Sequence, residues 1–152
     1  MLKTNRADNK VGRFMVASGA VIELGETGKI LLLKRSNELD WQPGEWEIMY
    51  GRIDQFESPE EGLRREVVEE TGLENLEIIE ILSVWHIYRG GEKKVKNDLV
   101  GITYRCRTQT EKVKISSEHS DYKWVEPKEA LKMIKIEGIA GDVKKYLEVV
   151  SK

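Results

Sequence analysis

The sequence contains a single cysteine, Cys106, and this scarcity excludes a disulfide within the chain. A chain without a disulfide framework is typical of a reducing compartment, so we expect a cytoplasmic protein. Cys106 stands in an apolar, β-prone stretch, and we expect it to be a buried strand residue.

Long apolar runs are also missing. The longest, VASGAVI and ILLL, fall far short of the roughly 18 residues that a membrane helix needs. The opening MLKTNRADNK carries basic residues but no apolar core and no small-residue cleavage site, so we do not expect a secretory signal. Composition therefore predicts no association with a membrane.

Neither sign of charge is in large excess. The chain has 25 Lys and Arg against 27 Asp and Glu, a formal net charge of -2. This balance provides no general attraction to a nucleic-acid polymer or an anionic surface. A phosphate-bearing partner would be a small molecule held by local groups, and the composition leaves the oligomeric state open.

The chain does have enough length and apolar content for a core. Its 152 residues, 39% of them hydrophobic, predict one domain over residues 13–152 that follows a flexible tail over residues 1–12. Apolar, β-prone runs predict strands over residues 14–22, 30–33, 46–50, 76–84, 98–107 and 122–125. The first two form a hairpin around Gly25–Gly28, and Gly90-Gly91 predicts a second hairpin turn between residues 85–88 and 93–95.

Three helices are expected. The first begins at Ser58-Pro59, with Glu61 completing a capping box, and ends near Thr71 before Gly72. A second begins at Pro127 and runs to about residue 134. The third has an apolar stripe formed by Ile139, Val143, Leu147 and Val150.

The first helix concentrates negative charge on one face. Glu66, Glu69 and Glu70 are related by i, i+3 and i, i+4 spacing, so their carboxylates repel one another. A hard divalent cation such as Mg²⁺ prefers carboxylate oxygens and commonly bridges them to substrate phosphates. Arg65 is placed to pair with Glu69, or with Glu57 just before the helix.

The segment GRIDQFESPEEGLRREVVEETGL resembles the Nudix box, G-x5-E-x7-R-E-U-x-E-E-x-G-U, where U is aliphatic. All nine specified positions agree, and a chance match is on the order of one in a million or rarer. The matching residues are Gly51, Glu57, Arg65, Glu66, Val67, Glu69, Glu70, Gly72 and Leu73.

The resemblance implies an α/β fold, in which a mixed sheet lies between helices, and hydrolysis of a nucleoside diphosphate linked to another moiety. Carried over by position, it implies that Glu69 and Glu70 bind the metal and that Glu66 acts as ligand or base. The Gly51 carbonyl would be a further ligand, with Glu57 and Arg65 in support. Mg²⁺ is the expected cofactor, and Mn²⁺ a possible substitute.

Outside the box, Glu118 stands in a segment that resembles the region where many relatives place another acidic residue near the metal.

The sequence departs from the family pattern just before the box, where many relatives have Pro-Gly-Gly and this chain has Met49-Tyr50-Gly51. A bulky Tyr50 at this turn predicts altered geometry at that edge of the site.

Three residues are candidates for substrate contact. Trp85 and Tyr88 follow the strand after the box and offer aromatic faces for a nucleobase, although core packing is an alternative role. Arg35 ends the second strand and could contact a phosphate, as could the lysines of residues 93–96, although such charges often remain solvated.

Nucleoside triphosphate pyrophosphohydrolysis is the favoured function, because the chain is compact and shows no added recognition domain. Hydrolysis of ADP-ribose, a nucleotide sugar or a dinucleoside polyphosphate stays open. A Nudix-fold ligand sensor without turnover is the alternative from another class, and the intact glutamates argue against it. An isoprenoid diphosphate isomerase is disfavoured, because Cys106 lacks the motif context of such an enzyme.

Overall fold

A computed structural model describes residues 12–152; the tail predicted over residues 1–12 therefore lies almost wholly outside the described residues. The elements, in chain order, are β1 (Met15–Leu24), β2 (Ile30–Arg35), β3 (Trp46–Glu47), β4 (Met49–Arg52), α1 (Pro59–Thr71), β5 (Glu77–Tyr88), the 3₁₀ helix η1 (Val95–Asn97), β6 (Asp98–Thr108), β7 (His119–Val125), α2 (Pro127–Met133) and α3 (Glu137–Val150). None of the helices within residues 12–152 is both long and apolar enough to cross a membrane.

The sheet is mixed, as the sequence predicted. Its strand order is β3-β2-β1-β6-β5, with β4 also paired to β1 and β7 to β2. The strands β1 and β6 run parallel along their whole length, whereas the other pairs are antiparallel. A central strand that is covered on both faces is apolar in consecutive positions rather than in alternate ones. This explains the uninterrupted ILLL run in β2.

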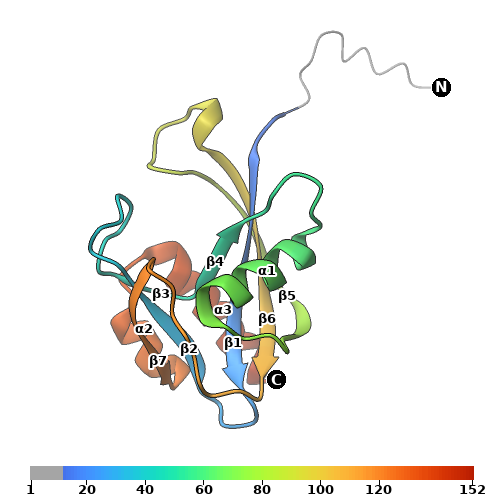
Figure 1. Ribbon diagram of the computed structural model, residues 1–152, viewed down its shortest axis with the longest axis vertical. Coiled ribbons are helices and arrows are strands. Elements are labelled where there is room, and N and C mark those ends of the chain that lie inside the picture. The colour runs from blue at the N-terminus through green and yellow to red at the C-terminus, as the bar shows by residue number, and fades with distance from the viewer. Residues whose placement is uncertain (1–11) are drawn as a thin grey trace, which may run out of the picture.

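Helices cover both faces of the sheet (Figure 1). In β2, Leu31 and Leu33 pack into the core beneath α1, while Ile30 and Leu32 point to the core beneath α2 and α3. Successive strand residues point to opposite faces, so one short run supplies both cores. The predicted arrangement of a sheet between helices is confirmed, and Cys106 is fully buried in β6.

The predicted bounds of α1 are confirmed in detail. The Ser58 hydroxyl accepts a hydrogen bond from the Glu61 amide, and the Glu61 carboxylate accepts one from the Ser58 amide. Gly72 ends the helix with φ 71°, a left-handed conformation that favours glycine. These caps fix where the helix starts and stops, and with it the positions of its carboxylates.

The second predicted hairpin is present, but β5 and β6 form it and its connection is longer than predicted. Residues 85–88 do not turn back onto residues 93–95, because β5 continues to Tyr88 and pairs with β6 as far as Asp98. The glycines at 90 and 91 have positive φ as a turn requires, but they belong to a longer connection. In α3 the inward stripe also differs from the expectation, since Tyr146 is buried and Val150 is exposed.

Candidate active site

A large open cleft of about 1290 Å³ is lined by residues of the sheet, of α1 and of α3, and the loop between β4 and α1 forms part of its wall. Of the predicted site residues, those that line it are Arg35, Gly51, Glu57, Glu66, Glu70, Trp85 and Glu118. Residues far apart in the sequence therefore meet here, and the Nudix-like segment forms the acidic part of the lining.

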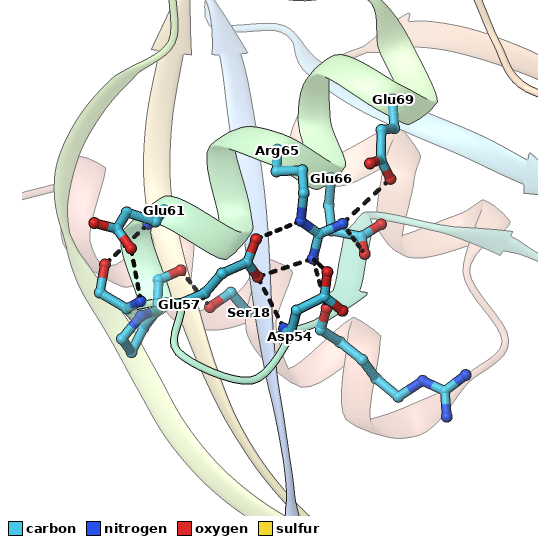
Figure 2. A network of polar contacts seen from close by, with 10 residues as sticks. Ser18, Asp54, Glu57, Glu61, Arg65, Glu66 and Glu69 are labelled. Carbon is cyan, nitrogen blue, oxygen red and sulfur yellow. Dashed lines mark hydrogen bonds and ion pairs between the residues drawn. The ribbon is translucent and has the colours of Figure 1, made fainter.

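Arg65 organises the helix carboxylates (Figure 2). Its Nε atom lies 2.5 Å from Glu57 Oε1, and its Nη1 atom lies 2.9 Å from Glu66 Oε1 and 3.2 Å from Glu69 Oε2. Its Nη2 atom donates to the Arg52 carbonyl oxygen at 3.1 Å. A planar guanidinium suits such divergent contacts, so one side chain fixes the loop and the helix relative to each other.

Both pairings predicted for Arg65 are therefore present, to Glu57 and to Glu69. Glu57 also accepts a hydrogen bond from the Asp54 amide at 2.8 Å, which anchors its carboxylate to the loop. The hydrogen bonds from Arg65 and from this amide lower the pKa of Glu57. Glu57 is thus held charged, as a partner of Arg65.

Gly51 makes room for Glu66. A methyl group at Gly51 would overlap the Cγ and Cδ atoms of Glu66 and lie 2.7 Å from its Cβ atom. The backbone of Gly51 pairs with Ser18 of β1, so this strand cannot move aside without breaking the sheet. The glycine that begins the motif therefore lets the Glu66 side chain cross directly over β4.

Glu70 is the most deeply buried carboxylate of the set. Its Oε2 atom has no hydrogen-bond partner among the described residues. Burial, followed by the neighbouring Glu118 and Glu66, raises the pKa of Glu70 to about 10. Burial also raises the pKa of Glu66, although Arg65 opposes this. A divalent cation would relieve both effects, because it would satisfy the unpartnered oxygen and offset the repulsion.

Buried charges continue behind Glu70. The His119 Nδ1 atom lies 3.9 Å from Glu70 Oε2, and its Nε2 atom lies 2.8 Å from Glu47 Oε1. Glu47 in turn contacts Arg35 at 3.1 Å. Because Arg35 also donates to the Trp41 carbonyl oxygen, much of its hydrogen-bonding capacity is used within the protein. Neither Glu47 nor His119 was among the residues predicted for the site; for Glu47, a Glu within an apolar strand segment was the available signal.

Two predicted residues lie differently from the others. Glu69 is 57% exposed and turns toward Arg65, outside the cleft lining. Tyr88 also lies outside the lining, where it packs edge-on against His86. Along β5 the cleft is lined by alternate residues, Ser83, Trp85 and Ile87, so Tyr88 falls on the other face. The structure brings Trp85, but not Tyr88, to the site.

The donor set fits a hard cation, although it is not assembled as a cluster. Within residues 12–152, no three His, Cys, Asp or Glu side chains already lie close enough together to hold a metal ion. Arg65 draws two of the carboxylates toward itself, whereas Glu70 and Glu118 face the cleft. Glu66 lines the cleft despite its contact with Arg65, so Glu66, Glu70 and Glu118 would hold a metal, with the Gly51 carbonyl beside them.

Comparison with known proteins identifies the family. The NUDIX domain model matches residues 13–147. The chain is 34% identical over 110 residues to the nucleoside triphosphatase NudI of Escherichia coli, covering 67% of this chain and 76% of that protein. It is 30% identical over 112 residues to a MutT-like protein of Streptomyces ambofaciens, covering 74% of this chain and 64% of the relative.

Among solved structures, the MutT protein of Methanosarcina mazei Go1 superposes with a TM-score of 0.75 at 25% identity, covering 93% of this chain and 99% of that one. The chain belongs to the Nudix family, and it is an enzyme of the pyrophosphohydrolase class.

Proposed function

We propose that the chain hydrolyses a nucleoside triphosphate to a nucleoside monophosphate and a phosphate product, with Mg²⁺ as cofactor and Mn²⁺ as a substitute. The observation that carries this proposal is the convergence of Glu66, Glu70 and Glu118 on one open cleft, with Glu70 buried and unpartnered. The similarity to a nucleoside triphosphatase supports the triphosphate over the other diphosphate substrates of the class.

The bound cation would neutralise charge on the phosphate oxygens and favour ionisation of the attacking water. Glu57 and Arg65 hold the Glu66 carboxylate against the Gly51 backbone, so its position is set before substrate arrives. A carboxylate of the helix set accepts the proton of the attacking water. No covalent intermediate with the protein is needed.

Glu69 differs from the other carboxylates of the helix, because it does not line the cleft. The family motif assigns it to the metal, whereas here its carboxylate contacts Arg65 at the exposed side of the helix. The helix turn that carries Glu69 also carries Glu66 and Glu70, so a rotation of this side chain away from Arg65 would direct it toward the same ion. Its role as a ligand stays a prediction.

A hydrolysis panel tests the proposal. Nucleoside triphosphates, ADP-ribose, a nucleotide sugar and a dinucleoside polyphosphate would be incubated with Mg²⁺ or Mn²⁺, and the products separated by ion-exchange chromatography. We expect triphosphates to be cleaved fastest and the Glu70→Gln variant to lose at least about 100-fold in kcat, as expected when a group on the reacting centre is removed.

Glu74→Gln is the matched control, because it makes the same charge change on an exposed residue just beyond the helix. Faster cleavage of one of the other substrates would overturn the triphosphate assignment. Equal rates for wild type and the Glu70→Gln variant would overturn the assignment of Glu70 to the active site.

A further inference from the structure

A second polar group lies in the cleft, away from the acidic helix, and the Nudix motif does not account for it. Asp142 of α3 is buried, with 6% of its surface exposed, and accepts hydrogen bonds from three hydroxyl groups. Ser83 donates to Oδ1 at 2.7 Å, Thr103 donates to Oδ2 at 2.7 Å, and Tyr50 also donates to Oδ2. Three of these four residues, Tyr50, Ser83 and Asp142, line the cleft.

These contacts use every hydroxyl proton of the group. The Ser83, Thr103 and Tyr50 protons all point to Asp142, and the Trp85 indole N–H donates to the Thr103 oxygen at 3.0 Å. An aspartate has no proton of its own to offer when ionised, and a hydroxyl that has given its proton offers only lone pairs. The polar side-chain atoms that this group leaves available to a ligand are therefore hydrogen-bond acceptors.

Aromatic rings frame these acceptors. The Tyr50 and Trp85 rings meet edge to face at 5.9 Å and 84°. Each ring lies against a glycine of a neighbouring strand, Tyr50 on Gly19 and Trp85 on Gly101, and a methyl group at either glycine would overlap the ring. Tyr50 departs from the family pattern. Its ring packs against Gly19, and its hydroxyl group donates to the buried Asp142. We call Tyr50, Ser83, Trp85 and Asp142 the cleft floor.

We propose that the cleft floor recognises the base of the substrate and selects bases that carry an amino group over bases that carry an oxo group at the same position. This inference rests on the proposed nucleotide function and extends it to substrate choice. An amino group would donate to the free lone pairs of the floor. An oxo group would bring a further acceptor against them and leave both sides without a partner.

The size of the effect follows from this mismatch. A buried polar group left without its partner discriminates far more strongly than a missing methylene group. The floor is open to the cleft on one side, and water can partly compensate there. We therefore expect a preference of about 10-fold to 100-fold in kcat/KM, a range that one to two lost hydrogen bonds give.

Two matched substrate pairs measure the preference. CTP and UTP share sugar and phosphates and carry an amino or an oxo group at the pyrimidine 4-position, while GTP and XTP carry an amino or an oxo group at the purine 2-position. We expect kcat/KM for the amino-bearing member to exceed that of its partner by about 10-fold or more in at least the pyrimidine pair. Equal values within both pairs, or a preference for the oxo-bearing members, would overturn the proposal.

Two variants test whether the cleft floor causes the preference for amino-bearing bases. Ser83→Ala removes one acceptor, and Tyr50→Phe removes another while keeping the ring on Gly19. In each we expect the CTP to UTP ratio to fall toward one, mainly through a higher KM for CTP. Ser151→Ala, at the end of α3 and outside the cleft lining, should keep the wild-type ratio. If Ser83→Ala loses its circular-dichroism spectrum, Tyr50→Phe supplies the same comparison.

A binding measurement separates this inference from the proposed function. If no triphosphate is hydrolysed, the proposed function fails. Calorimetry with CMP and UMP then still measures whether the cleft floor prefers one base over the other. Binding of CMP about 10-fold tighter than UMP would support the floor as a base-recognition site. Equal affinities, tighter binding of UMP, or no binding of either would contradict it.

Discussion

Gly51→Ala offers a sharp perturbation of the site, because it adds one methyl group at a known contact. Gly51 does not have a positive φ, so alanine is compatible with its backbone conformation. The new methyl carbon would lie 2.7 Å from Glu66 Cβ and would overlap Cγ and Cδ. Carbon atoms in contact prefer about 3.5 Å or more, so the Glu66 side chain must move by about 1 Å.

A displacement of this size at a reacting centre costs about 100-fold in rate. We therefore expect kcat of Gly51→Ala to fall by about two orders of magnitude, measured as phosphate or pyrophosphate release from the preferred triphosphate. The strained contact should cost about 1 to 3 kcal/mol of stability, measured by urea unfolding. The variant should thus remain folded and bind nucleotide, while turnover is lost.

Gly141→Ala is the control for this change. Gly141 lies in α3, and a methyl group there meets no atom within 4 Å. Alanine is the better helix former by about 1 kcal/mol, so this variant should be as active as wild type and slightly more stable. A Gly51→Ala protein with wild-type kcat would refute the reasoning that Gly51 positions Glu66.

Three further outcomes are expected. Arg65→Lys should lose about 10-fold or more in kcat, because one ammonium group cannot replace the separate contacts to Glu57 and Glu66; steady-state kinetics measures this, and unchanged kcat would contradict it. Ser58→Ala should lose about 1 kcal/mol in urea unfolding with kcat nearly intact, because it removes one cap of α1. Burial opposes ionisation of Glu23, but hydrogen bonds from Tyr146 and Arg105 outweigh it and lower the pKa of Glu23. Because the folded pKa is lower than the unfolded one, this stabilisation is present at neutral pH and is lost as the pH falls through the folded pKa; Glu23→Gln should flatten that part of the profile of unfolding free energy against pH, below about pH 5.

The acidic helix was predictable because its determinants are local. The cap at Ser58, the stop at Gly72 and the spacing of Glu66, Glu69 and Glu70 all lie within one short segment, and helical periodicity turns this spacing into a shared face. The contacts of Arg65 followed from the same spacing. Sequence reasoning is strong where neighbours in space are neighbours along the chain.

The faces of β5 could not be predicted in the same way. Its pairing with β6 shifts register between Ile78 and Glu80 and again between Ile81 and Ser83. Each bulge changes which side chains point to the cleft, and a shift of one residue exchanges the two faces. Trp85 and Tyr88 are three residues apart, so alternation puts them on opposite faces, but the sequence does not tell which of the two faces the cleft.

The cleft floor was beyond prediction for a different reason. Tyr50 and Asp142 lie 92 residues apart, and Asp142 and Ser83 lie 59 apart, so only the tertiary fold joins them. One signal did exist, because Asp142 occupies a position on the apolar stripe of α3, next to Val143 and three residues after Ile139. A charged residue on such a stripe is buried with partners or marks a site.

The central claim is that Glu70 and its neighbouring carboxylates bind a divalent cation in the cleft. Titration of the full chain with Mn²⁺, followed by electron paramagnetic resonance of the free ion, tests it without any assumption about the substrate. We expect wild type and Glu74→Gln to bind Mn²⁺ with similar affinity, and Glu70→Gln to bind it at least 10-fold more weakly. Equal Mn²⁺ affinity in all three proteins would contradict the claim.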